Sequence, residues 1–190
     1  MVALRFLTTF VVASTMLLSG GCELWKSGGS VFTSSKHAYS LPVPAGWSYA
    51  TTMGPDFVAS KDGLTLQSIA VQVSPLEDAL MHSERSLRVD MIPFEVAETI
   101  IDDLRADREL DSLAVLRNEP ATIGGRVGFK LTLAYRNHDQ LRMTETRYAV
   151  IHSGQLWTLR FRAPSRHYHG RDLGDFERMV AGFQFRAGTE

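Results

Sequence analysis

Apolar and polar residues alternate with a period of two through much of the second half of the chain. The alternation is seen in three successive runs, at residues 127–135, 144–151 and 157–161. Because successive side chains of a strand point to opposite faces, each run is predicted to be a half-buried β-strand. The connections at 137–139 and 153–154 are short, so the strands are expected to form an antiparallel meander. Its larger inward-facing side chains include Phe129, Trp157 and Phe161.

Two other segments have the helical period of three to four residues. In residues 93–107, Pro93 suits a first helical position, and one stripe is apolar. That stripe consists of Ala97, Ile100, Ile101 and Leu104. The acidic residues Glu95, Glu98, Asp102 and Asp103 are expected mainly on the solvated side. A second helix is predicted around residues 173–180, ending at Gly182, with Phe183 and Phe185 adding a terminal strand to the sheet.

The segment before the first helix contains shorter strand signals. A strand from Tyr39 ends in the Pro-Ala-Gly turn before Trp47, and Lys61-Asp62-Gly63 separates two β-rich runs as a hairpin turn. Gly124-Gly125 is the turn that enters the meander. Helices segregated from an antiparallel meander indicate an α+β fold with helices packed on the sheet faces.

The N-terminus has the features of an export signal. Arg5 precedes an apolar run at residues 6–18, which is shorter than the about 20 residues needed to cross a bilayer. Small residues then precede Cys22, and this arrangement resembles a bacterial lipoprotein signal, although ordinary signal peptidase would also accept them. The resemblance implies removal of residues 1–21 and a diacylglycerol on Cys22. Residues 22–36 are expected to be a flexible tether, and residues 37–190 a single domain.

Composition excludes several classes of protein. The net charge is -1, so no excess of positive charge favours nucleic acid as a partner. The single cysteine excludes a disulfide framework and a Cys-rich zinc site. Serine-hydrolase, phosphate-loop and zinc-protease motifs do not occur, so no catalytic residue and no cofactor are expected.

The order of turns and core positions resembles the PsbP/DcrB-like family over residues 37–186. The positions that carry the resemblance are the turn before Trp47, Gly124-Gly125, Tyr148, the 154–157 segment, Ala163, Phe176, Val180 and the 182–185 segment. The resemblance implies an α/β/α sandwich around a central antiparallel sheet. Family members include a photosystem subunit, a nuclear-transport protein and bacterial lipoproteins, most of which bind other proteins. A shared fold is weak evidence for any one role, and no functional residue carries over.

Two groups of residues are candidates for binding. His167 and His169 would point the same way on an extended segment and could hold a metal with a third ligand; an exposed polar loop is the alternative. The meander is rich in arginine, and facing strands could gather Arg142, Arg147, Arg160 and Arg162 into a surface for an anion or a partner. Cross-strand pairing with Glu145, or burial of the arginine stems, is the alternative.

These observations predict an exported protein without catalysis, anchored by lipid on Cys22 and facing the periplasm from the inner or outer membrane. Its expected role is that of an accessory protein binding another envelope protein. The alternative is a lipoprotein that binds a small ligand or a metal.

Overall fold

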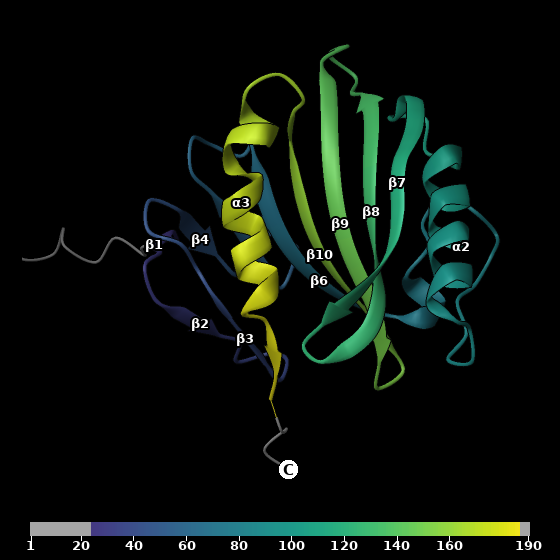
Figure 1. Ribbon diagram of the computed structural model, residues 1–190, viewed down its shortest axis with the longest axis horizontal. Helices are drawn as coiled ribbons and strands as arrows, with labels where there is room; N and C mark the ends of the chain where they lie inside the picture. The colour runs from purple at the N-terminus through teal and green to yellow at the C-terminus, as the bar shows by residue number, and fades with distance from the viewer. Residues whose placement is uncertain (1–23, 187–190) are drawn as a thin grey trace, which may run out of the picture.

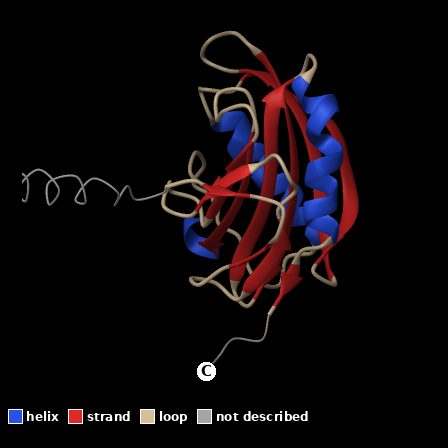
Figure 2. Cartoon of the chain, turned by 90° about the vertical axis from the view of Figure 1, so that its left-hand side faces the viewer, coloured by secondary structure: helices blue, strands red, loops and turns tan. Residues whose placement is uncertain are grey.

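A large antiparallel sheet lies between two helices in the computed structural model, which describes residues 24–186 (Figures 1 and 2). Within those residues the sheet has eight strands in the order β1-β4-β5-β6-β10-β9-β8-β7, and a smaller sheet has the order β11-β3-β2. Helix α2 covers one face of the large sheet and α3 the other. The predicted α+β fold, a helix–sheet–helix sandwich, is confirmed.

The strands of the large sheet are β1 (Lys26–Ser27), β4 (Ser48–Ala50), β5 (Phe57–Ser60), β6 (Ser68–Pro75), β7 (Asp111–Ile123), β8 (Arg126–Arg136), β9 (Arg142–His152) and β10 (Gln155–Pro164). The smaller sheet contains β2 (Val31–Thr33), β3 (Tyr39–Pro42) and β11 (Gln184–Phe185). The helices are a 3₁₀ turn η1 (Leu76–Asp78), α2 (Pro93–Ala106) and α3 (Tyr168–Ala181).

The meander predicted from the alternation is formed by β8, β9 and β10, which pair antiparallel in that order. Its turns require backbone in the left-handed region. Gly124 and Gly125 have φ of 54° and 78°, and Ser153 and Gly154 have 52° and 72°. Two successive residues with positive φ match the right-handed twist of the flanking strands, which favours tight hairpins at both places.

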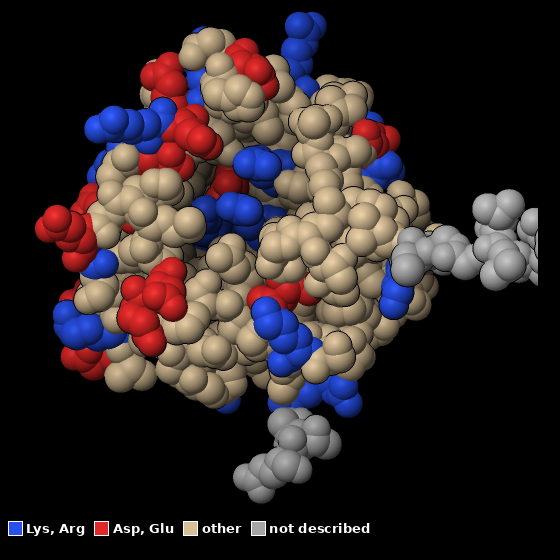
Figure 3. Space-filling model, turned by 180° about the vertical axis from the view of Figure 1, so that it is seen from behind, with Lys and Arg blue, Asp and Glu red and all other residues tan. Residues whose placement is uncertain are grey.

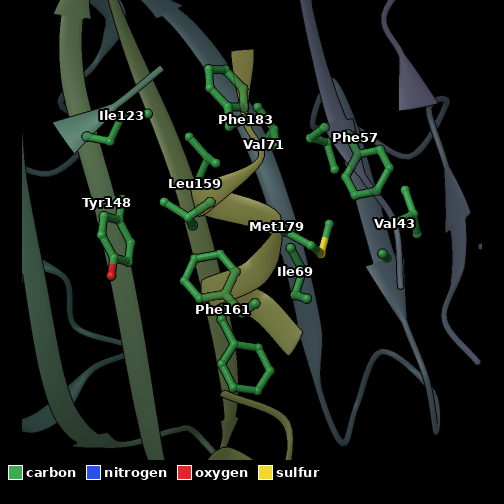
Figure 4. Close-up of a cluster of buried hydrophobic side chains, with 14 of the residues drawn as sticks. Val43, Phe57, Ile69, Val71, Ile123, Tyr148, Leu159, Phe161, Met179 and Phe183 are labelled. Atoms are coloured by element: carbon green, nitrogen blue, oxygen red, sulfur yellow. The ribbon is translucent and has the colours of Figure 1, made fainter. Parts of the chain in front are cut away.

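The core between the sheet and α3 is rich in aromatic residues (Figure 4). Trp157, Leu159 and Phe161 on β10 all face it, as their alternation predicts. Phe176 and Met179 of α3 close over them, and both are almost fully buried. On the other face, the apolar stripe of α2 packs against Phe129, Leu131 and Leu133 of β8. Val127, which the alternation placed with these buried residues, is 72% exposed at the start of the strand.

The structure differs from the expected tether at residues 22–36. Residues 26–27 pair with β4, and residues 31–33 pair with β3. The Ser/Gly composition was misleading, because Gly28 lies against backbone: its N–H donates to the Trp47 carbonyl at 2.7 Å, and a Cβ would lie 2.4 Å from the Pro44 oxygen. Phe32 packs against Phe57, with the ring centroids 5.0 Å apart. The folded domain therefore begins near residue 26, not at residue 37.

Two further differences concern strands. The long edge strand β7 was not predicted, because bulges near Ser112 and Leu116 shift its register and interrupt the alternation. The C-terminal strand β11 pairs with β3 in the smaller sheet, not with the large sheet as predicted. Its residue Phe185 packs on Trp157, with centroids 5.0 Å apart.

Candidate binding groove

Strand register brings three of the four predicted arginines together on the α2 side of the sheet. Arg160 of β10 lies directly opposite Arg147 of β9, and Arg162 lies opposite Glu145. Residues two apart on a strand share a face, so the three arginines and Glu145 form a compact group of four. Because α2 packs on β7 and β8, this group over β9 and β10 lies beside the helix.

Glu145 neutralises one of these arginines. Its side chain is buried, and its Oε1 accepts a hydrogen bond from Arg147 Nε at 2.9 Å and lies 2.7 Å from Arg147 Nη2 in an ion pair. Burial would raise the pKa of Glu145, but the positive charges of Arg147 and Arg160 outweigh it and hold that pKa below its usual range. The alternative expected from the sequence, pairing with Glu145, is therefore realised for Arg147.

Arg160 has a different environment. It is partly buried, and among residues 24–186 no carboxylate lies within ion-pair distance of its guanidinium or that of Arg162. Burial lowers the pKa of Arg160, Glu145 opposes that change, and the like charges of Arg147 and Arg162 add to it. An anion that accepted hydrogen bonds from Arg160 would offset both the cost of burying its charge and the repulsion from the neighbouring arginines.

A groove of about 140 Å³ opens over two members of this group, Arg147 and Arg160, and we call it the arginine groove. Figure 3 shows this face of the molecule, where basic side chains gather in a hollow near the centre with acidic atoms between them. The sheet side of the groove is formed by Ala70, Gln72, Ser74, Arg147, Leu156, Thr158 and Arg160. The opposite wall is formed by residues 79–82 together with Ile100, Asp103, Leu104 and Asp107 of α2 and its C-terminal end.

Asp103 holds this wall in place. It was predicted on the solvated side of α2 but is only 6% exposed, because it lies three residues after Ile100 at the border of the apolar stripe. Its carboxylate accepts hydrogen bonds from the backbone N–H groups of Met81, His82 and Ser83 at 3.3, 2.8 and 2.8 Å. Asp107 lies 3.4 Å from Nε2 of His82. The two carboxylates are thus occupied by the wall itself and not by Arg160.

Arg142 does not belong to the group. It lies opposite Arg136 at the far ends of β8 and β9, exposed, on the face opposite to that of Glu145 and Arg147. Arg142 is therefore separated from the other three arginines both by its place at the end of the strand and by the face to which its side chain points.

The two histidines considered as metal ligands are also separated. Residues 168–181 are helical, so the extended geometry that would align the two imidazoles is absent. His167 is exposed, whereas His169 is buried, lies 3.1 Å from the Thr146 hydroxyl and stacks on Phe161. Over residues 24–186 there is no cluster of three side chains suited to hold a metal ion. Cys22 lies outside the described residues.

A large antiparallel sheet with one helix on each face and a polar groove beside α2 places the protein among small α+β sandwich domains. The chain belongs to the PsbP family, whose profile matches residues 27–185. No curated protein gave a significant match. Within the described part of the chain, no helix is both long and apolar enough to cross a membrane.

Several solved structures share this fold. Cyanobacterial PsbP (CyanoP) from Synechocystis sp. PCC 6803 is 14% identical, with a TM-score of 0.59 over 88% of this chain and 95% of its own. LpqN, described as involved in cell envelope biogenesis of Mycobacterium tuberculosis, is 16% identical, with a TM-score of 0.53 over 78% and 83%. The Ran-binding protein Mog1p of Saccharomyces cerevisiae is 13% identical, with a TM-score of 0.53 over 84% and 96%. At these identities the likeness concerns the fold alone.

Proposed function

We propose that this PsbP-family protein is a non-catalytic accessory protein of the bacterial cell envelope that binds an anionic group of another envelope protein in the arginine groove. The observation that carries the proposal is Arg160, a partly buried guanidinium at the groove with no carboxylate within ion-pair distance among residues 24–186. Leaving a cation in this state is costly unless an anion completes it, and a bound partner would supply one.

The envelope location rests on the N-terminal sequence. The apolar run and the small residues before Cys22 favour export and lipidation of that cysteine, and the similar fold of LpqN, a protein of cell envelope biogenesis, is consistent with such a setting. A lipid anchor confines the domain to a thin layer beside the membrane. This confinement raises its effective concentration for partners in the same membrane, so that weak contacts suffice.

A small-molecule ligand fits the groove less well. Pockets for such ligands usually enclose about 300–1,000 Å³, whereas the arginine groove measures about 140 Å³. The groove is a surface hollow with charged side chains in it (Figure 3), which suits a protruding side chain of a protein better than an enclosed molecule.

Lipidation is tested by growing cells with a radiolabelled fatty acid. The wild-type protein should carry label and sediment with the membranes, whereas Cys22→Ser should be unlabelled and soluble because the thioether cannot form. A wild-type protein that is unlabelled and entirely soluble would contradict the anchor.

Partner binding is tested by photo-crosslinking in whole cells from a reactive residue at position 158, inside the groove. We expect a discrete crosslinked product that is lost when Arg160→Met is added and kept when Arg142→Met is added, since Arg142 lies outside the groove. A hydrogen bond to a charged group contributes about 1.5–3 kcal/mol, so the loss should be at least about tenfold. Equal crosslinking in the two variants would overturn the proposal.

A further inference from the structure

The arginine groove is lined by apolar side chains as well as by charged ones. Besides Arg147 and Arg160 it is lined by the hydrophobic side chains of Leu80, Met81, Ile100, Leu104 and Leu156. Ile100, Leu104 and Leu156 are buried, whereas Met81 is 78% exposed. Charged and apolar side chains therefore line a single groove.

Met81 is exposed although its backbone is fixed. Its N–H donates to Asp103 at 3.3 Å, and the next two N–H groups donate to the same carboxylate. A flexible, polarizable thioether on a fixed backbone is well suited to contact an apolar side chain of a partner. The wall of the groove thus carries an exposed apolar side chain on a fixed backbone.

The charges around the groove favour a singly charged anion. Two arginines, Arg147 and Arg160, and two carboxylates, Asp103 and Asp107, line the groove, and Arg147 is already paired with Glu145 beside it. A dianionic phosphate would be repelled by the wall carboxylates more strongly than a carboxylate would. The planar fork of a guanidinium also matches the two oxygens of a carboxylate.

We propose that the occupant is a protein segment in which an Asp or Glu stands beside a large apolar residue, the carboxylate binding Arg160 and the apolar side chain packing on Met81 and Leu80. This inference rests on the proposed function and specifies its partner. The recognised feature is a pair of adjacent or nearly adjacent residues, one acidic and one apolar.

The test is a selection of random heptapeptides on the full-length protein, purified in detergent. We expect enrichment of peptides that contain an acidic residue within two positions of Leu, Ile, Met or Phe. Enrichment for acidic residues without apolar neighbours would overturn this inference and leave the proposed function standing. Enrichment without acidic residues would overturn both, and so would competition by inorganic phosphate or by anionic phospholipid vesicles that displaced the peptides.

Variants distinguish the contribution of the apolar side chains of the groove from that of Arg160. Met81→Ser should weaken binding of the best selected peptide about fivefold, because the apolar side chain of the peptide would lose part of the surface that it covers. Met53→Ser, at an exposed methionine in the loop after β4, should leave binding unchanged.

Thr158→Glu would place a carboxylate two residues from Arg160, as Glu145 stands two residues from Arg147. We expect that variant to remain folded and to bind the peptide at least about tenfold more weakly, because the new carboxylate would pair with Arg160 in place of the peptide's carboxylate. Unchanged binding by Thr158→Glu would contradict the proposal.

Discussion

Replacing Trp157 with alanine is expected to lower the free energy of unfolding by about 3–5 kcal/mol, the usual cost of removing a large aromatic side chain from a core. Trp157 is 4% exposed and makes edge contacts with Tyr39 and Phe185, at centroid distances of 5.7 and 5.0 Å. It thus joins β10 to the strands β3 and β11 of the smaller sheet. Its indole N–H also donates to the His152 carbonyl at 3.3 Å.

Urea unfolding followed by circular dichroism measures this effect. The matched control is Leu116→Ala on β7, where the side chain is 54% exposed and the expected change is within about 0.5 kcal/mol. Equal midpoints for Trp157→Ala and the wild type would show that the inward face of β10 has been assigned wrongly.

Removing the Glu145 carboxylate should be about as damaging. Glu145→Ala leaves Arg147 without its ion-pair partner and leaves three positive charges together, and breaking a buried pair in this way costs about 3–5 kcal/mol. The control is Glu119→Ala on β7, whose exposed carboxylate lies 3.9 Å from Arg117 and should contribute less than about 1 kcal/mol. A loss no larger than that of the control would contradict the assigned role of Glu145.

The effect of Glu145 depends on pH in a defined direction. Its pKa in the folded protein is lower than the ordinary glutamate value of 4.5, so the unfolded state takes up a proton first as the pH falls. The stabilisation is fully present above pH 4.5 and is lost as the pH falls through the lowered pKa. The difference in stability between wild type and Glu145→Ala should therefore be constant from pH 7 to about pH 5.5 and shrink at more acidic pH. A difference that grew on acidification would contradict the lowered pKa.

Local patterns were sufficient to predict the parts of the fold in which each strand has one buried face. The alternation around Trp157 and the stripe around Ile100 report burial directly, so the meander and both helices were expected with the correct facing. Strand β7 was not expected, because its bulges interrupt the period of two. Strands β1 and β2 were missed because glycine can indicate either flexibility or close backbone contact, and Gly28 serves the second purpose.

The candidate site could be predicted only in part for a similar reason. Arg147, Arg160 and Arg162 lie on adjacent strands, so alternation and a short turn bring them together. The opposite wall comes from residues 79–83, whose position depends on three hydrogen bonds to Asp103 of α2. Contacts between an irregular segment and a helix leave no periodic signal in the sequence, so neither the groove nor its apolar lining could be inferred from the sequence alone.

The early start of the first strand sets the geometry of the proposed anchor. Lys26 already belongs to β1, so only residues 23–25 would join a lipid on Cys22 to the folded domain, and the four steps from Cys22 to Lys26 span about 14 Å when fully extended. Such an anchor would hold the β1 edge of the sheet close to the bilayer, with β7 at the opposite edge. Strand β10, which carries Arg160, is four strand spacings from β1, or about 19 Å. A partner that reaches the groove would have to present its acidic segment on a part that stands clear of the membrane surface.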